Sequence, residues 1–126
     1  MSKIKVVAYC RVATPNQMDL DWQVDYVKKY IESHADWDFA GVYAEAASAL
    51  PLNKRPAMQR LRKDALKGEF QKVISFSASR YARNSLGLIR MIQYFKEHGV
   101  SLMTIKEGDI ADYIKHDIGL LKALEG

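Results

Sequence analysis

The stretch Ile4-Lys5-Val6-Val7-Ala8-Tyr9-Cys10 decides how this chain is expected to fold. It is a short and almost continuously apolar run, which is typical of a strand buried on both faces of a parallel sheet. Further strands are predicted at residues 37–43, 72–76 and 100–106. The first strand is therefore expected to lie inside a sheet, with neighbours on both sides.

Helices are predicted between these strands, over residues 17–33, 56–67 and 79–98. In the first of them, apolar residues recur at steps of four, three and four, which places them on one stripe of the helix. Strands that alternate with helices of this length indicate βαβ units. The sequence therefore predicts a three-layer α/β domain, with a mainly parallel sheet of four to five strands and helices on both faces.

Length and composition narrow the class of protein further. The chain has 126 residues, which fits one domain, and its only cysteine, Cys10, excludes both an internal disulfide and a four-cysteine zinc site. There is no run of about 18 apolar residues and no signal-peptide pattern, so we expect a cytoplasmic protein without membrane contact. The net charge of +4 favours an anionic partner.

Arginines follow three of the predicted strands, where an open α/β sheet places its chemistry. Arg11 comes directly after the first strand, Arg55 closes the loop after the second, and Arg80 and Arg83 follow the third. Their spacing of three is expected to put Arg80 and Arg83 on one face of the long helix. Guanidinium groups stay charged and bind phosphate oxygens in a bidentate fork. We therefore predict that Arg11, Arg80 and Arg83 face one phosphodiester pocket.

Three short motifs occur in order along the chain. The first runs from Tyr9 to Thr14 with glutamines downstream, the second from Tyr43 to Ala49 with Arg55-Pro56 after it, and the third from Ser77 to Asn84. Together they resemble the catalytic domain of serine recombinases, the resolvase/invertase family. The resemblance covers residues 3–110, so it carries more weight than any one motif alone.

The resemblance implies a domain that breaks a DNA strand with a serine hydroxyl, holds a 5′-phosphoserine link, exchanges strands and religates them. It implies DNA as the partner, a homodimer or tetramer in the full-length protein, and no metal or other cofactor. It also implies the site residues: Ala13 at the nucleophile position, Arg11, Arg80 and Arg83 around the phosphate with Arg55 close by, Gln17 and Gln23 as donors, Glu45 and Ser48 ordering the arginines or the loop, and Ser79 as a donor or as the N-cap of the long helix.

The match breaks at the nucleophile. Ala13 has no hydroxyl, so covalent catalysis of the family type is impossible at this residue and we expect the chain to be inactive as given. Glu45 stands where the family has aspartate, and Ala49 where it has glycine. These departures leave open whether Ala13 is a natural loss or an engineered one.

The expected domain division is a recombinase catalytic domain over residues 1–110 and the truncated start of a following helix over residues 111–126. Ile114, Ile118 and Leu121 would share one face of that helix. One alternative is a non-catalytic module that keeps the fold and the arginines to bind DNA or a partner. Another is an unrelated flavodoxin-like phosphate or nucleotide binder, although the chain has no P-loop motif and no acidic residues after its first strand.

Overall fold

The computed structural model describes residues 3–49 and 51–115. Within them, five strands form one sheet in the order β2-β1-β3-β4-β5. All strand pairs are parallel except β4 and β5, which run antiparallel. This arrangement confirms the predicted fold class. The strands are β1 (Ile4–Val12), β2 (Trp37–Ala46), β3 (Lys72–Ser75), β4 (Ser101–Thr104) and β5 (Gly108–Asp109).

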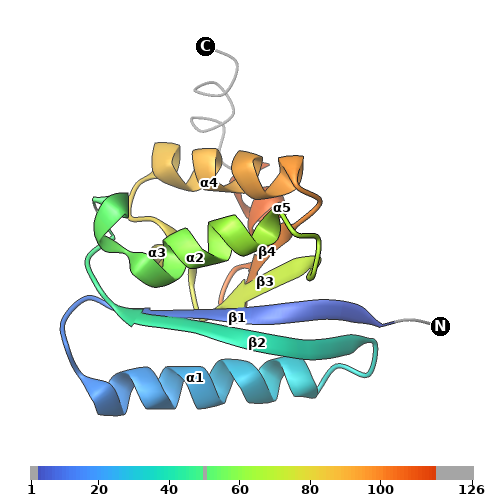
Figure 1. Cartoon of the computed structure of the whole chain (residues 1–126), viewed down its shortest axis with the longest axis horizontal. Coiled ribbons are helices and arrows are strands. Elements are labelled where there is room, and N and C mark those ends of the chain that lie inside the picture. Colours follow the sequence, from blue (N-terminus) through green and yellow to red (C-terminus); the bar gives the residue numbers. More distant parts are fainter. Residues whose placement is uncertain (1–2, 50, 116–126) are drawn as a thin grey trace.

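Helices cover both faces of this sheet, as predicted. Figure 1 shows α1 on one face, and α2 and α4 stacked on the other. The expected residues Ile118 and Leu121 of the final helix lie outside the described part of the chain. The helices are α1 (Gln17–Glu32), the 3₁₀ turn η1 (Leu52–Lys54), α2 (Pro56–Ala65), α3 (Ala78–Tyr81), α4 (Ser85–Glu97) and α5 (Ile110–Lys115).

Strand β1 contributes to two separate cores, because side chains alternate between the faces of a strand. Val6, Ala8 and Cys10 pack in the core beneath α1. Val7 and Tyr9 point the other way, into the core formed with α2 and α4. All five side chains are buried, which confirms that this strand lies inside the sheet.

The long helix predicted over residues 79–98 is wrong, because α3 and α4 are separate helices. Ala82, between them, has extended backbone with φ of −155° and ψ of 152°. Asn84 then starts α4 as its N-cap, and its side-chain oxygen accepts a hydrogen bond from the N–H of Gly87 at 2.7 Å. Ser79 lies inside α3 and is not the N-cap of a long helix. The apolar stripe that predicted the long helix begins at Leu88, after the break, so the stripe could not reveal the break.

Arg11 and Glu45 lie inside strands, although the sequence predicted them to follow the strand ends. Both β1 and β2 are longer than expected, and Arg11 pairs with Glu45 across them. Arg11 and Glu45 are therefore held by strand pairing, whereas Ala13 and Ser48 follow the ends of these strands.

Candidate active site

Arg11 joins three segments at the carboxyl end of β1. Its Nε donates to the carbonyl oxygen of Arg80 at 3.0 Å, Nη1 to that of Ala47 at 2.9 Å and Nη2 to that of Ser79 at 2.6 Å. The side chain is only 3% exposed. Arg11 therefore fixes the loop after β2 and the helix α3 against β1.

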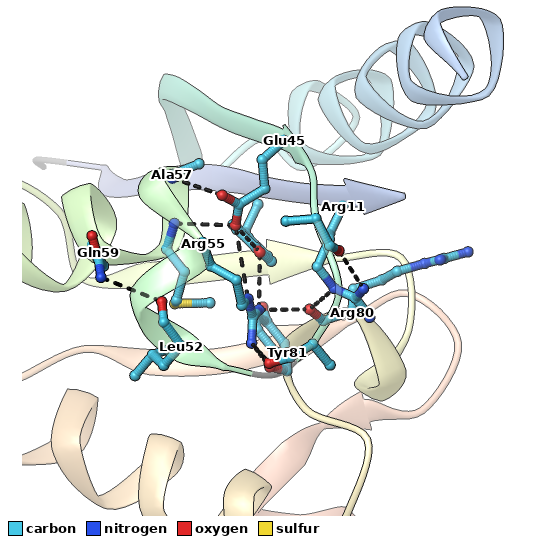
Figure 2. A network of polar contacts seen from close by, with 12 residues as sticks. Arg11, Glu45, Leu52, Arg55, Ala57, Gln59, Arg80 and Tyr81 are labelled. Carbon is cyan, nitrogen blue, oxygen red and sulfur yellow. Dashed lines mark hydrogen bonds and ion pairs between the residues drawn. The ribbon is translucent and has the colours of Figure 1, made fainter. Parts of the chain in front are cut away.

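Arg55 is even more deeply buried, at 1% exposed, and lies beside this contact. Its Nη1 donates to the carbonyl oxygens of Ala49 and Tyr81, at 3.1 and 2.8 Å, and its Nη2 donates to that of Arg80 at 3.0 Å. Figure 2 shows the carbonyl oxygen of Arg80 between the guanidinium groups of Arg11 and Arg55. Two arginines from separate segments thus hold the same short helix.

Glu45 neutralises this buried charge and also caps α2. Its carboxylate lies 3.8 Å from Nε of Arg55 and accepts a short hydrogen bond from the hydroxyl of Tyr9. The same carboxylate accepts from the backbone N–H groups of Ala57 at 2.7 Å and Met58 at 3.2 Å. A carboxylate is favourable at this position, because the first N–H groups of a helix lack partners within the helix. Glu45 therefore orders both Arg55 and the start of α2.

The two predicted glutamines have different surroundings. Gln23, on α1, is buried and forms two hydrogen bonds with the backbone of Arg11, accepting from its N–H at 3.0 Å and donating to its carbonyl oxygen at 3.2 Å. Gln17 is exposed and donates to Asp21 on the same helix at 2.8 Å. Only Gln23 is built into the end of β1.

A cavity of about 280 Å³ lies beside Ala13, between the end of β1, the start of α1 and Arg80. In Figure 2 the Arg80 side chain extends away from the buried network, while its carbonyl oxygen stays within it. Nε of Arg80 is buried and has no hydrogen-bond partner. Arg80 therefore offers an unused donor next to the expected nucleophile position.

Arg83 lies apart from this cavity. It is exposed in the segment between α3 and α4 and lines two other cavities. The prediction that Arg11, Arg80 and Arg83 face one pocket is therefore wrong: Arg80 lines the cavity beside Ala13, whereas Arg83 lines other cavities and Arg11 donates to backbone carbonyl oxygens. The spacing of three residues failed as an argument because α3 ends at Tyr81.

The predicted serines lie around the same edge of the sheet. Ser48 is exposed in the loop after β2. Ser79 is exposed too, and its Oγ lies 2.9 Å from that of Ser77, while its carbonyl oxygen is held by Arg11.

Four positive charges influence one another at this edge. Burial lowers the pKa of Arg11, and the nearby charges of Arg55, Arg80 and Arg83 lower it further. Like charges gathered in this way repel one another, so the cluster favours a bound anion.

Three further residues support the site, and the sequence did not single out their roles. The Tyr9 hydroxyl lies between Glu45 and Arg55, and burial raises its pKa. The buried Tyr81 donates to the carbonyl oxygens of strands β3 and β4, and Glu107 accepts from the N–H of Ala78 at the start of α3. Of these three residues, only Glu107 has a local sequence signal for its role. It follows Thr104 by three residues, and a Thr-x-x-Glu sequence often forms a local cap.

Residues 3–49 and 51–115 contain neither a candidate metal site nor a membrane-spanning helix. No group of three or more histidine, cysteine or acidic side chains is arranged to hold a metal ion. No helix there combines the length and apolar character needed to cross a bilayer.

The parallel sheet, its two helical layers and the arginines at its strand ends define a resolvase-type α/β domain. The family model described as "Resolvase, N terminal domain" matches residues 6–123, and the chain belongs to this family of serine recombinase catalytic domains. Among curated proteins, none is detectably similar to the chain.

Solved structures agree with this assignment. The N-terminal catalytic domain of TP901-1 integrase is 29% identical with a TM-score of 0.75, over 82% of this chain and 79% of that one. A resolvase family site-specific recombinase from Streptococcus pneumoniae is 26% identical with a TM-score of 0.73, over 98% and 87%. The C-terminal catalytic domain of ISC1926 TnpA, an IS607-like serine recombinase, is 22% identical with a TM-score of 0.73, over 91% and 78%, and shows the shared fold.

Proposed function

We propose that this chain is a recombinase catalytic domain that binds a DNA phosphodiester in the cavity beside Ala13 and that lacks the nucleophile needed to cleave it. One observation carries the proposal: Arg80 lines the same cavity as Ala13 and has a buried Nε without a partner. A phosphate in that cavity would lie beside the Arg80 side chain, and Nε could donate to it once the guanidinium turns toward the cavity. The cluster of positive charge around Arg11 favours the same ligand.

The chemistry requires a hydroxyl at position 13. With serine there, Oγ would form a bond to phosphorus, the bond from phosphorus to the 3′ oxygen would break, and that oxygen would leave with a proton. The reverse step would restore the DNA, so the strand can be religated without a cofactor. Negative charge grows on the phosphate oxygens during each step, and guanidinium groups fixed in advance stabilise it. The methyl group of Ala13 can do none of this.

The remaining predicted residues fall into two groups under this proposal. Arg80 would contact the phosphate directly, and Arg83 would do so only after the segment between α3 and α4 rearranges. Most of the others would act as positioning residues, since their hydrogen bonds hold backbone or other side chains; they are Arg11, Arg55, Gln23, Glu45 and Ser79. Gln17 and Ser48 are exposed near the edge of the site, so they would contact DNA and would not position other site residues.

The proposed partner is DNA, and the proposed assembly of the full-length protein is a homodimer or tetramer. The division into a catalytic domain over residues 1–110 and a following helix is part of the same proposal. A chain of this kind should bind duplex DNA without strong sequence preference, because phosphate contacts position a protein but do not specify a sequence.

Fluorescence anisotropy with a labelled duplex tests the phosphodiester site. We expect a Kd of about 10⁻⁴–10⁻⁶ M that weakens steeply with added salt. Arg80→Ala should weaken binding and reduce its salt dependence. Arg60→Ala is the matched control, because Arg60 is exposed on α2 and lies over the ring of Tyr43. Equal effects of the two substitutions would contradict the proposed site.

Ala13 itself favours the second candidate function, a non-catalytic module that keeps the fold and binds DNA or a recombinase partner. This candidate predicts that restoring serine at position 13 yields no covalent link to DNA, although DNA binding persists.

A further inference from the structure

An exposed apolar stripe on α1 leads to the cavity that Ala13 and Arg80 share. Met18, Trp22 and Tyr26 follow at steps of four, and their side chains are 83%, 56% and 44% exposed. Steps of four residues place side chains on one face of a helix. Contiguous apolar side chains on a surface mark a binding site more often than a chance exposure.

Two of these side chains are fixed in place by a third ring. Trp22 stacks on Tyr26 with ring centroids 5.1 Å apart, and Phe76 meets both rings edge-on with centroids 5.7 Å away. Phe76 directly follows β3, in the connection that leads to α3 and Arg80. We call Trp22, Tyr26 and Phe76 the aromatic platform. Its rings are held by the same segment that holds the arginine.

One ring of the platform, Trp22, shares a cavity with Arg80. Trp22 lines the cavity of about 280 Å³ together with Ala13 and Arg80. A phosphate held by Arg80 would therefore bring the attached nucleotide within reach of the Trp22 ring. The base is the part of a nucleotide that has a flat apolar face to offer this ring.

The charges around the platform argue for a base and against the DNA backbone. Asp19, Asp21 and Asp25 lie on the same helix, between or beside the platform residues. Their partners are Asn16, Gln17 and Lys29, so only one of the three carboxylates is paired with a positive charge. Asp19 also lines the cavity with Arg80, and Asp21 and Asp25 make the rest of this surface unfavourable for further phosphates, whereas a neutral base is not repelled.

We infer that the aromatic platform stacks on an unpaired DNA base next to the phosphate bound by Arg80. The inference rests on the proposed phosphodiester site and adds a preference for the state of the DNA. A base inside a duplex is already stacked on its neighbours and must be extruded before a side chain can stack on it. DNA with unpaired bases beside the bound phosphate should therefore bind more tightly than fully paired DNA.

The test compares two labelled DNAs of equal length, a full duplex and a duplex with a short single-stranded gap, by fluorescence anisotropy. The protein should prefer the gapped DNA. Trp22→Ala should lower the affinity for gapped DNA roughly tenfold and leave the affinity for duplex nearly unchanged. Trp22→Phe should keep most of the preference, since it keeps an aromatic ring. Met18→Ala is the matched control on the same stripe and should change neither affinity.

A second readout compares the two DNAs with the unmodified protein and uses the variant Trp22→Phe only to assign the signal to Trp22. Unlabelled gapped DNA should quench tryptophan emission more strongly than duplex DNA, and Trp22→Phe should remove that difference. Equal quenching by the two DNAs would overturn the inference.

Arg80→Ala separates the two proposals. If it changes neither affinity, the phosphodiester site itself fails. If it weakens both DNAs while Trp22→Ala affects both equally or neither, the stacking inference fails alone. The inference also fails if Trp22→Ala and Met18→Ala both reduce self-association in sedimentation experiments and leave DNA binding intact, because the stripe would then be a protein interface.

Discussion

Arg55 donates a hydrogen bond to the carbonyl oxygen of Arg80 at 3.0 Å, so a fully buried guanidinium holds the backbone of a residue whose own guanidinium lines a cavity. The two arginines thus have opposite surroundings. Nε lacks a hydrogen-bond partner in both arginines, but Arg55 donates through Nη1 and Nη2 to protein acceptors and has the Glu45 carboxylate 3.8 Å from its Nε. The first belongs to the scaffold, and the second is available to a ligand.

Replacing Arg55 should therefore affect stability. Arg55→Ala leaves the buried carboxylate of Glu45 without its positive partner and several carbonyl oxygens without donors. We expect the free energy of unfolding to fall by about 3–5 kcal/mol, measured by urea denaturation. Arg60→Ala, on the exposed side of α2, should stay within about 0.5 kcal/mol of the unmodified protein. A loss below about 1 kcal/mol for Arg55→Ala would show that the network is not structural.

The first turn of α4 is capped by the side chain of Asn84. Asn84→Ala removes the oxygen that accepts from the N–H of Gly87 and should lower the free energy of unfolding by about 1 kcal/mol. Asn84→Asp keeps an acceptor and should lose little. Ser85→Ala, at the next position, provides the control for a simple surface change. If all three variants melt alike, the cap does not stabilise α4.

Stability should decline in alkaline solution, and the thiol should start the decline. Burial raises the pKa of Cys10 to about 12 from an ordinary value of 9.0. Above pH 9.0 the unfolded chain loses this proton while the folded chain keeps it, so the unfolded state gains stability. The free energy of unfolding should fall by about 1.4 kcal/mol per pH unit from this group alone.

Two buried tyrosines extend the same decline. Burial raises the pKa of Tyr9 and of Tyr81, so their contribution is complete below about pH 10 and is lost as the pH rises further. Urea titrations at successive pH values measure the slope. Cys10→Ala should move the onset from near pH 9 to near pH 10. An unchanged onset in that variant would show that the thiol is not the group responsible.

Restoring the missing hydroxyl tests the chemistry. Ala13→Ser should allow a covalent protein–DNA link, visible on denaturing gels after incubation with a library of labelled duplexes. Adding Arg80→Ala should reduce the link by about 10²–10³-fold, because a fixed donor to the developing charge is lost. The unmodified protein should form no link. If it does, Thr14 or Ser48 must carry the nucleophile.

The sequence predicted the layers of the fold well because its signals are local. An apolar run gave β1, and the spacing of apolar residues gave α1. The break after Tyr81 was not visible, since it depends on an extended Ala82 and on a cap that Asn84 provides only in three dimensions. Strand β5 has two residues, too few to show any periodicity.

For the candidate site, the sequence indicated which residues gather but not what each one contacts. Arg11 and Arg55 do lie near one another, since both donate to the carbonyl oxygen of Arg80. However, Arg11 and Arg55 use their donors on backbone carbonyl oxygens, which no motif reveals. The partner of a buried guanidinium depends on how separate segments pack, and packing is not encoded in spacing along the chain.

The positive charges around Arg11 favour the binding of an anion, but they repel one another in the folded protein. Arg55, Arg80 and Arg83 all lower the pKa of Arg11, so each of them repels the positive charge of Arg11 in the folded protein. Removing Arg80, which lines the cavity beside Ala13, should relieve part of this repulsion: Arg80→Met would give a protein that is harder to unfold and poorer at binding an anion. Conversely, an anion that binds there would raise the melting temperature, because it stabilises only the folded form. The arginines of this site therefore repel one another in the unbound protein, and a bound anion would reduce that repulsion.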